Sequence, residues 1–256
     1  MFEEIRKLLL EKKIDTRIKD ELIIIRINQA DGLKLAKEII YKAANQKTAL
    51  FLSGGSTPKP LYEAFAEERK LNIGAAAMID ERYGKPFHEN SNEKMVKETG
   101  LLLYLKEKNI PFYSALWKDK SQEKSILNYD EAIRYLLFNF PKNMAILGIG
   151  SDGHTAGIAP NKRDFSNPLF EKEKKGVFVG GFDDGKDFST GFGKRITLTF
   201  SALSMMDFIL ILAFGKNKRK ALSKMFEKGD LADLPARFYL EKDIVRKTLL
   251  ITDQKV

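Results

Sequence analysis

The 256-residue chain contains no cysteine, only two histidines and one tryptophan. Without cysteine there is no disulfide framework, no thiolate nucleophile and no cysteine-based zinc site, so we do not expect metal chemistry. The composition also agrees with a reducing compartment. Because histidine titrates near neutral pH, the few histidines are the first candidates for moving protons.

No part of the sequence is typical of a secretory signal or a membrane span. Residues 1–13 mix Glu3, Glu4, Arg6 and Lys7 with a short apolar run, which fits neither kind of segment. No Pro/Ser-rich linker and no internal repeat divides the chain, and 43% hydrophobic residues suffice for a substantial core. We therefore expect a cytoplasmic protein that forms one domain over residues 1–256 and does not bind membranes.

Positive charge is in excess, with 44 Lys and Arg against 35 Asp and Glu and a net charge of +9. Such a balance favours anionic ligands through long-range attraction. The basic residues are scattered, however, and the densest group, at 216–220, lacks the interleaved aromatic residues of a single-strand binder. We expect a small anionic molecule as the partner and no nucleic acid; no feature of the sequence fixes an oligomeric state.

Helical and strand patterns alternate along the chain. Apolar runs predict buried strands at residues 21–27, 48–52, 75–79, 144–147 and 208–214. Helical spacing predicts helices at residues 33–44, 60–69, 92–105 and 125–138. Further short strands are expected at 111–116 and 176–179, whereas 161–193 has little periodicity. This alternation indicates an α/β fold with a mainly parallel sheet flanked by helices, similar to a Rossmann fold.

The most informative motif follows the apolar run at 144–147 and reads Gly148-Ile149-Gly150-Ser151-Asp152-Gly153-His154-Thr155. Glycines at a strand end let backbone amides approach a ligand closely. Open α/β sheets bind their ligands at the carboxyl ends of strands. His154 lies at such an end, and we take it as the candidate catalytic residue.

A second glycine motif, Ser53-Gly54-Gly55-Ser56-Thr57-Pro58, joins the strand at 48–52 to the helix at 60–69. Free backbone amides, three hydroxyl groups and the positive end of a helix all suit a phosphate group. The lysine of a nucleotide-binding P-loop is absent, which favours a small phosphorylated metabolite over a nucleoside triphosphate. The alternative is an ordinary strand-to-helix turn with an N-cap.

A charged motif, Asp80-Glu81-Arg82, follows the strand at 75–79, and Ser91-Asn92 begins the next helix. The planar fork of Arg82 could hold a carbonyl or carboxylate group. Asp80 or Glu81 could orient that arginine or contact substrate hydroxyls. The alternative is a solvated acidic turn followed by an N-cap.

Two basic residues further along the chain, Arg195 and Lys218, lie next to predicted strands. Each could form a charge-assisted hydrogen bond to phosphate. Each could equally be an exposed surface residue, which is the ordinary state of a lysine.

In combination, these motifs resemble the 6-phosphogluconolactonases, and the match spans nearly the whole chain. The motifs that carry the resemblance occur in the family's order: Ser53-Gly54-Gly55-Ser56-Thr57-Pro58-Lys59-Pro60-Leu61-Tyr62, Asp80-Glu81-Arg82, the run from Gly148 to Ala156, Arg195-Ile196-Thr197 and Leu234-Pro235-Ala236. The resemblance implies the α/β fold shared with glucosamine-6-phosphate deaminase and ribose-5-phosphate isomerase. It also implies hydrolysis of 6-phospho-D-glucono-1,5-lactone to 6-phosphogluconate in the oxidative pentose phosphate pathway.

The resemblance also implies roles for the motif residues. His154 acts as general base on a water molecule, Asp152 orients its imidazole, and Arg82 steadies the negative charge on the carbonyl oxygen. No metal, cofactor or covalent nucleophile is required. The groups expected to bind substrate and its phosphate are Ser53, Gly54, Gly55, Ser56, Thr57, Asp80, Arg195 and Lys218.

Two alternatives stay open, a glucosamine-6-phosphate deaminase and a sugar-phosphate-binding protein without turnover. The deaminases carry a glutamate five residues after the motif histidine, where this chain has Ala159, which favours hydrolysis. The lactonase family usually continues Thr-Ala-Ser-Leu-Phe-Pro after this histidine, whereas residues 155–160 read Thr-Ala-Gly-Ile-Ala-Pro. A serine and an aromatic residue are thus absent near the site, and the substrate preference could differ from that of the family. We expect the second histidine, His88, to be an exposed loop residue.

Overall fold

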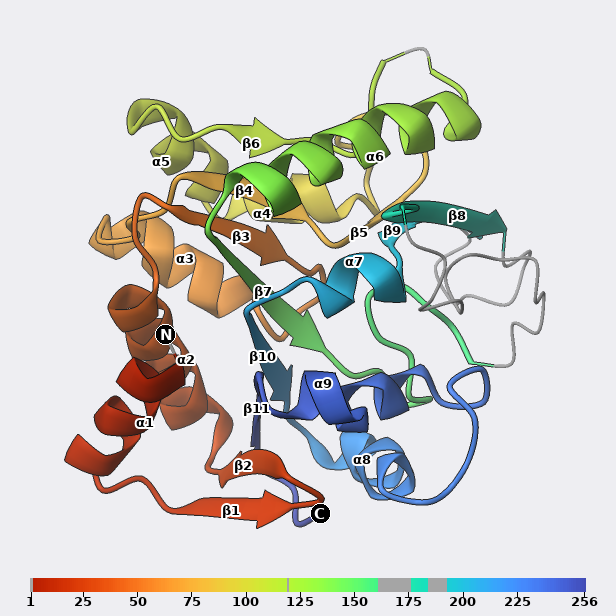
Figure 1. The fold of residues 1–256 in the computed structure, drawn as a ribbon. Helices are drawn as coiled ribbons and strands as arrows, with labels where there is room; N and C mark the ends of the chain where they lie inside the picture. Colours follow the sequence, from red (N-terminus) through yellow and green to blue (C-terminus); the bar gives the residue numbers. More distant parts are fainter. Residues whose placement is uncertain (1, 119, 161–175, 184–192) are drawn as a thin grey trace.

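An eight-stranded sheet forms the centre of the computed structural model, which describes residues 2–118, 120–160, 176–183 and 193–256 (Figure 1). The strands lie in the order β1-β2-β11-β10-β7-β3-β4-β6. Their bounds are β1 Thr16–Lys19, β2 Leu22–Arg26, β3 Thr48–Leu52, β4 Ala75–Met78, β6 Phe112–Tyr113, β7 Lys142–Gly148, β10 Phe208–Ala213 and β11 Thr248–Thr252. β1 pairs antiparallel with β2, and the other neighbouring pairs are parallel. The predicted mainly parallel sheet is confirmed.

Helices cover both faces of this sheet. Its first face packs against α1 (Phe2–Glu11), α2 (Gln29–Ala43), α3 (Lys59–Glu68) and α5 (Leu101–Glu107). The second face packs against α6 (Gln122–Asn139), α7 (Phe200–Ser204), α8 (Arg219–Met225) and α9 (Lys242–Val245). In β3, Phe51 belongs to the core on the second face and Leu50 to the core on the first. A strand buried on both faces therefore appears in the sequence as an unbroken apolar run.

A second, three-stranded sheet stands beside the first, in the order β5-β9-β8. Its antiparallel strands are β5 (Asp80–Arg82), β9 (Lys194–Leu198) and β8 (Val179–Asp183). Ile79 joins the sheets, because its N–H donates to Leu52 of β3 and its carbonyl accepts from Leu198 of β9. The alternative of a solvated turn at residues 80–82 is therefore wrong, since these polar residues pair with β9. The strand expected at 176–179 lies instead at 179–183.

Other boundaries also differ from the sequence prediction. The single helix predicted at 92–105 is two helices, α4 (Asn92–Glu98) and α5, because Gly100 lies between them with a φ of +82°. Left-handed backbone of this kind interrupts a helix and favours glycine. Strands β1 and β11, and the helices after β10, had no prediction. Most of the region at 161–193 lies outside the described residues.

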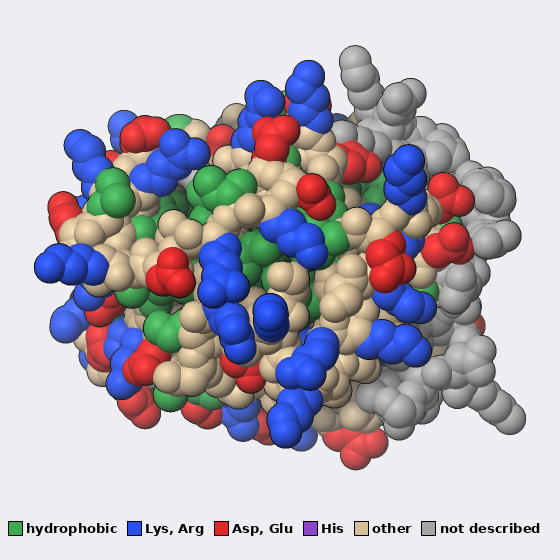
Figure 2. All heavy atoms as spheres, turned by 90° about the horizontal axis from the view of Figure 1, so that it is seen from below, with side chains coloured by type: hydrophobic (Ala, Val, Ile, Leu, Met, Phe, Trp, Pro, Cys, Tyr) green, Lys and Arg blue, Asp and Glu red, His purple; other side chains and the backbone are tan. Residues whose placement is uncertain are grey.

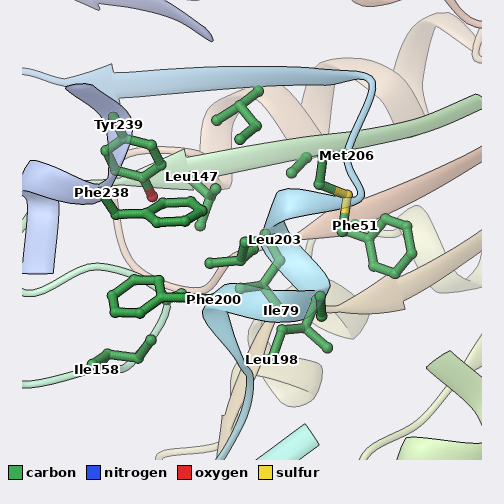
Figure 3. Close-up of a cluster of buried hydrophobic side chains, with 14 of the residues drawn as sticks. Phe51, Ile79, Leu147, Ile158, Leu198, Phe200, Leu203, Met206, Phe238 and Tyr239 are labelled. Carbon is green, nitrogen blue, oxygen red and sulfur yellow. The ribbon is translucent and has the colours of Figure 1, made fainter. Parts of the chain in front are cut away.

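A cluster of buried side chains holds the end of β7 against the second sheet and the C-terminal helices (Figure 3). Phe200 of α7 and Phe238 of the 3-10 helix η3 (Pro235–Leu240) stack with ring centroids 4.6 Å apart. Ile158, from the segment after β7, is buried in the same cluster. This packing fixes the segment that carries the glycine–histidine motif.

The surface carries both signs of charge. On the face in Figure 2, Lys and Arg side chains are interspersed with Asp and Glu. This mixture agrees, for that face, with the scattered charge expected from the sequence. Within the described ranges, no helix is both long enough and apolar enough to cross a membrane.

Candidate active site

One cavity of about 280 Å³ gathers the predicted site residues at the carboxyl ends of the parallel strands. The residues that line it include Ser53, Gly54, Gly55, Ser56, Thr57, Asp80, Arg82, His154, Arg195 and Lys218. The cavity lies where β3 and β7 are neighbours. After β3 the chain enters α3 on one face of the sheet, and after β7 it packs into the core on the other. Ligand crevices of open α/β sheets occur at such switch points.

The glycine–histidine motif forms a tight loop at the end of β7. The Gly150 N–H donates to the His154 carbonyl at 2.8 Å, and the Gly153 N–H donates to the Gly150 carbonyl at 3.1 Å. A Cβ atom on Gly150 would lie 2.1 Å from Nδ1 of His154, which is too close for any side chain. The glycine at 150 therefore makes room for the imidazole at the mouth of the cavity.

His154 and Asp152 form a pair, with Nδ1 of the imidazole 2.6 Å from Oδ1 of the carboxyl group. Burial alone would raise the pKa of Asp152, but its hydrogen bonds and charge interaction with His154 outweigh burial and lower that pKa to about 2. An ionised carboxylate only accepts hydrogen bonds, so Nδ1 carries the proton and Nε2 is left to exchange one. Asp152 itself is not among the residues that line the cavity.

The Ser53–Thr57 loop leaves its polar groups open to the cavity. The Tyr62 hydroxyl donates to the Ser53 carbonyl at 2.9 Å and anchors the start of the loop. Oγ of Ser53 is buried and makes no hydrogen bond within the part of the chain that the structure describes. Gly55 has a φ of +97° and faces open space. A buried hydroxyl needs a partner, and an anion in the cavity would provide one.

The second sheet contributes a wall of charged groups. Arg82 of β5 and Arg195 of β9 are paired in register. Nη1 of Arg82 donates to the Asn90 carbonyl at 2.7 Å, and Arg195 is 3% exposed. The alternative that Arg195 is an exposed surface residue is therefore wrong, and Arg195 lines the cavity, where the phosphate-binding prediction requires it. The buried Arg195 and the half-buried Arg82 create a local positive charge beside the glycine loops, which suits an anion.

Asn92 is a cavity residue that the sequence reading placed only as a helix cap. Its Nδ2 donates to the backbone carbonyl of Asp80 at 2.9 Å and to the Asp80 carboxylate at 3.2 Å. The capping role belongs to Ser91, whose Oγ accepts from the Lys94 N–H at 3.0 Å. The Asp80 partner could not be found from spacing, because the start of α4 is held against β5 by the carboxyl group of Glu81, which accepts from the N–H groups of Asn92 and Glu93.

Lys218 enters the cavity from the segment after β10. It belongs to the 3-10 helix η2 (Lys216–Lys218) and is half-buried. Burial lowers the pKa of Lys218, and the nearby charge of Asp152 partly opposes that shift. The segment is shaped by Gly215, whose N–H donates to Oδ1 of Asp253 at 2.9 Å. Lys218 therefore faces the site rather than bulk solvent.

Gly157 and Ala159, which differ from the usual residues of the histidine motif in the lactonase family, lie in the segment beside the same cavity. Gly157 has a φ of +67°, and a Cβ atom there would lie 3.0 Å from Cβ of Asp80. Glycine thus keeps the backbone close to Asp80 where the family usually has serine. Ala159 is buried, so the position that is a glutamate in the deaminases brings no carboxylate to the site.

The second histidine does not line the cavity. His88 is half-buried, so the expectation of an exposed residue was wrong. Its Nδ1 accepts from the Asn90 N–H at 3.2 Å, which leaves Nε2–H to donate to the Arg82 carbonyl at 2.9 Å. These bonds fold the loop after β5 and explain the burial of the ring.

Sequence comparison identifies the relatives of this chain. A family model described as glucosamine-6-phosphate isomerases/6-phosphogluconolactonase matches residues 29–249. A 6-phosphogluconolactonase of Nostoc sp. is 32% identical over 200 residues, which cover 73% of this chain and 75% of that protein. A 6-phosphogluconolactonase of Thermotoga maritima is 32% identical over 207 residues, or 79% of this chain and 84% of that protein.

Solved structures agree with this grouping. The crystal structure of a 6-phosphogluconolactonase from Thermotoga maritima is 27% identical, has a TM-score of 0.67, and covers 90% of this chain and 98% of its own. The 6-phosphogluconolactonase from Plasmodium vivax has a TM-score of 0.74 and covers 98% of this chain and 95% of its own. At 19% identity, the second match supports the fold alone.

Proposed function

The chain belongs to the family of glucosamine-6-phosphate isomerases and 6-phosphogluconolactonases, and from this premise we propose that it hydrolyses 6-phospho-D-glucono-1,5-lactone to 6-phospho-D-gluconate. This is a step of the oxidative pentose phosphate pathway. The observation that carries the proposal is the His154–Asp152 pair, which opens into the same cavity as the Ser53–Thr57 loop. An acid–base group and an anion cradle are the two parts that hydrolysis of a phosphorylated lactone requires.

In the proposed mechanism, Nε2 of His154 takes a proton from a water molecule as its oxygen attacks the lactone carbonyl. The carbonyl oxygen becomes negatively charged in the tetrahedral intermediate. When the bond to the ring oxygen breaks, His154 returns the proton to that oxygen and is neutral again. Such general acid–base catalysis contributes roughly 10²- to 10⁴-fold. Asp152 stays ionised throughout and holds the imidazole in the required tautomer.

The other cavity residues bind the substrate in this proposal. Arg82 stabilises the charge on the carbonyl oxygen, because a fixed positive group in a partly dehydrated site favours the intermediate over the neutral lactone. Asp80 accepts hydrogen bonds from sugar hydroxyls. The phosphate is held by the Ser53–Thr57 loop together with Arg195 and Lys218, whose charges form charge-assisted hydrogen bonds.

Hydrolysis fits the cavity better than deamination. Isomerisation of an amino sugar needs a second acid–base group to open the ring, and the buried Ala159 cannot provide it. Lactone hydrolysis needs only an activated water and a protonated leaving oxygen. A hydrogen-bonded His–Asp pair would also be an unusual feature of a site that only binds a sugar phosphate, since binding needs no proton transfer.

The test compares His154→Ala with the wild type on freshly prepared 6-phosphogluconolactone, after correction for spontaneous hydrolysis. We expect kcat/KM to fall by roughly 10²- to 10⁴-fold, the usual contribution of a general base. His88→Ala is the matched control, because it removes the other imidazole, which does not line the cavity, and it should lose far less. Equal activity of wild type and His154→Ala would contradict the proposed mechanism.

A further inference from the structure

Glu81 is a completely buried carboxyl group located between two site residues. Successive side chains of a strand point to opposite faces, so Glu81 points away from the cavity while Asp80 and Arg82 line it. Its two oxygens accept four hydrogen bonds, from the N–H of Arg82 at 2.7 Å, Asn92 at 2.8 Å and Glu93 at 2.8 Å, and from Oγ of Ser91 at 2.9 Å. The carboxyl group therefore ties the start of α4 to β5.

The segment tied down in this way holds the site residues in return. The Asn90 carbonyl accepts from Nη1 of Arg82 at 2.7 Å. Nδ2 of Asn92 donates to both the carbonyl and the carboxylate of Asp80. The same asparagine packs against the Ser53–Thr57 loop: its Oδ1 is so close to Gly54 that a Cβ atom there would lie only 1.9 Å away. Asn92 thus lies between Asp80 and the glycine loop and sets the space between them.

We propose that Glu81 and Asn92 are positioning residues for the reaction. Glu81 fixes the start of α4, and from there Asn92 orients the Asp80 carboxylate while the Asn90 carbonyl orients the Arg82 guanidinium. A misplacement of about 1 Å in such groups can cost on the order of 10²-fold in rate, so a rigid support of this kind acts on chemistry as well as on folding. The inference rests on the proposed lactonase function, because Asp80 and Arg82 are assigned through it.

A neighbouring carboxyl group offers the matched control. Glu93 is also buried and begins the same helix. Its oxygens accept from the Ala115 N–H at 2.6 Å and the Ser114 hydroxyl at 2.5 Å, so its side chain ties α4 to the segment after β6. Among the described residues, its side chain bonds to Ser114 and Ala115, and neither lines the cavity. Its backbone N–H donates to Glu81, and Glu93→Gln leaves that N–H in place. Glu81→Gln and Glu93→Gln therefore make the same substitution in the same corner, with only the Glu81 side chain linked to the site.

The experiment measures kcat, KM and Tm for wild type, Glu81→Gln, Asn92→Ala and Glu93→Gln, with 6-phosphogluconolactone as substrate. We expect Glu81→Gln to lower kcat at least about tenfold, since a group that stabilises the transition state is displaced. Asn92→Ala should raise KM severalfold through Asp80. Glu93→Gln should lower Tm at least as much as Glu81→Gln does, while its kcat and KM stay at the wild-type values.

A double-mutant cycle separates positioning from direct contact. If Asn92 acts through Asp80, Asn92→Ala should have little further effect on KM in an Asp80→Ala background. Full additivity of the two substitutions would overturn this part of the inference. The cycle also decides the case in which Glu81→Gln does not fold, because Asn92→Ala leaves the Glu81 carboxyl group and its backbone donors in place.

The outcomes distinguish this inference from the function on which it rests. Wild-type protein that does not accelerate lactone hydrolysis would overturn the proposed function, and the inference with it. An active wild type combined with Glu81→Gln and Asn92→Ala variants of unchanged kcat and KM would overturn the inference alone. If Glu81→Gln and Glu93→Gln lose kcat in the same proportion to their fall in Tm, the inference would also be overturned, since the loss of rate would then reflect folding only.

Discussion

The two walls of the cavity are built in different ways. The wall after β7 consists of glycine backbone and His154; the side chains of His154 and of its partner Asp152 are 40% and 51% exposed. The wall formed by β5 and α4 consists of buried polar groups, with Glu81 fully buried and Asp80 and Asn92 nearly so. Buried hydrogen-bonded groups contribute to folding as well as to function, because an unmade bond there costs about 1–3 kcal/mol. The first wall can therefore lose a side chain without unfolding, and the second cannot lose one so easily.

Arg82→Ala tests the second wall where the expected effect is largest. Loss of one group that stabilises an oxyanion typically lowers kcat by about 10²- to 10³-fold. Arg82→Lys should restore little, because an ammonium group cannot reproduce a planar fork that also donates to the Asn90 carbonyl. Steady-state kinetics on 6-phosphogluconolactone measure the effect. A change in KM with constant kcat would show that Arg82 only binds the substrate or product.

Asp152→Asn tests the first wall. An amide can leave the imidazole in the wrong tautomer, so we expect a lower kcat/KM, by less than the roughly 10²- to 10⁴-fold contributed by the general base itself. Because the side chain is half exposed and solvent screens its interaction with His154, Tm should fall less than after the loss of a buried group such as Glu81. A large fall in Tm would contradict the contrast drawn between the two walls.

Lys218→Ala should have a smaller effect that depends on the phosphate group. A charge-assisted hydrogen bond is worth about 1.5–3 kcal/mol when well formed, and half-exposure reduces that value, so we expect KM to rise about tenfold with little change in kcat. The control substrate is the unphosphorylated 1,5-gluconolactone, for which wild type and variant should be equal. Equal losses on both lactones would contradict the assignment of Lys218 to the phosphate.

The pH dependence of stability gives the smallest effect, and it distinguishes the buried Glu81 from the half-exposed Asp152. Burial, and then the charge of Glu93, raise the pKa of Glu81 to about 7, so the folded state holds a proton that the unfolded state releases. Stability should therefore rise as pH falls from 8 to 6, by roughly 1 kcal/mol from this group. The contribution of Asp152 depends on pH with the opposite sign, because its pKa is lowered in the folded state. This contribution to stability is fully present above about pH 4 and is lost only in stronger acid.

Urea unfolding of wild type and Glu81→Gln at pH 6 and pH 8 measures this dependence. The variant should show a smaller increase in stability between the two values, because the titrating carboxyl group is gone. The buried Glu93, whose pKa burial also raises, supplies the remaining change in the same direction. An unchanged pH dependence in Glu81→Gln would contradict the assignment of that proton to Glu81.

The wall after β7 could be predicted from the sequence, and the wall of β5 could not be predicted in full. The loop at residues 148–155 directly follows an apolar strand, so its location at a strand end is a local property. Residues 80–82 form a strand by pairing with residues 195–197, which lie more than a hundred positions away. Asn92 contacts Asp80 because the buried Glu81 of this strand holds the start of α4. A three-residue polar strand has no apolar alternation to reveal it.

The fold shows the same division. Strands β3, β7 and β10 were predicted closely, because a strand buried on both faces is a continuous apolar run. β1 was not predicted, and all its residues are exposed, so it has no such run. The helix predicted at 92–105 is divided at Gly100, where one local feature outweighs the helical spacing on either side.

The central claim is that this site hydrolyses a phosphorylated lactone and does not deaminate an amino sugar. The most direct measurement gives purified wild-type protein each substrate separately, following 6-phosphogluconolactone by NMR and ammonia release from glucosamine 6-phosphate. We predict rapid loss of the lactone, well above its spontaneous hydrolysis, and no ammonia. Appreciable ammonia release, with lactone loss at the spontaneous rate, would contradict the account.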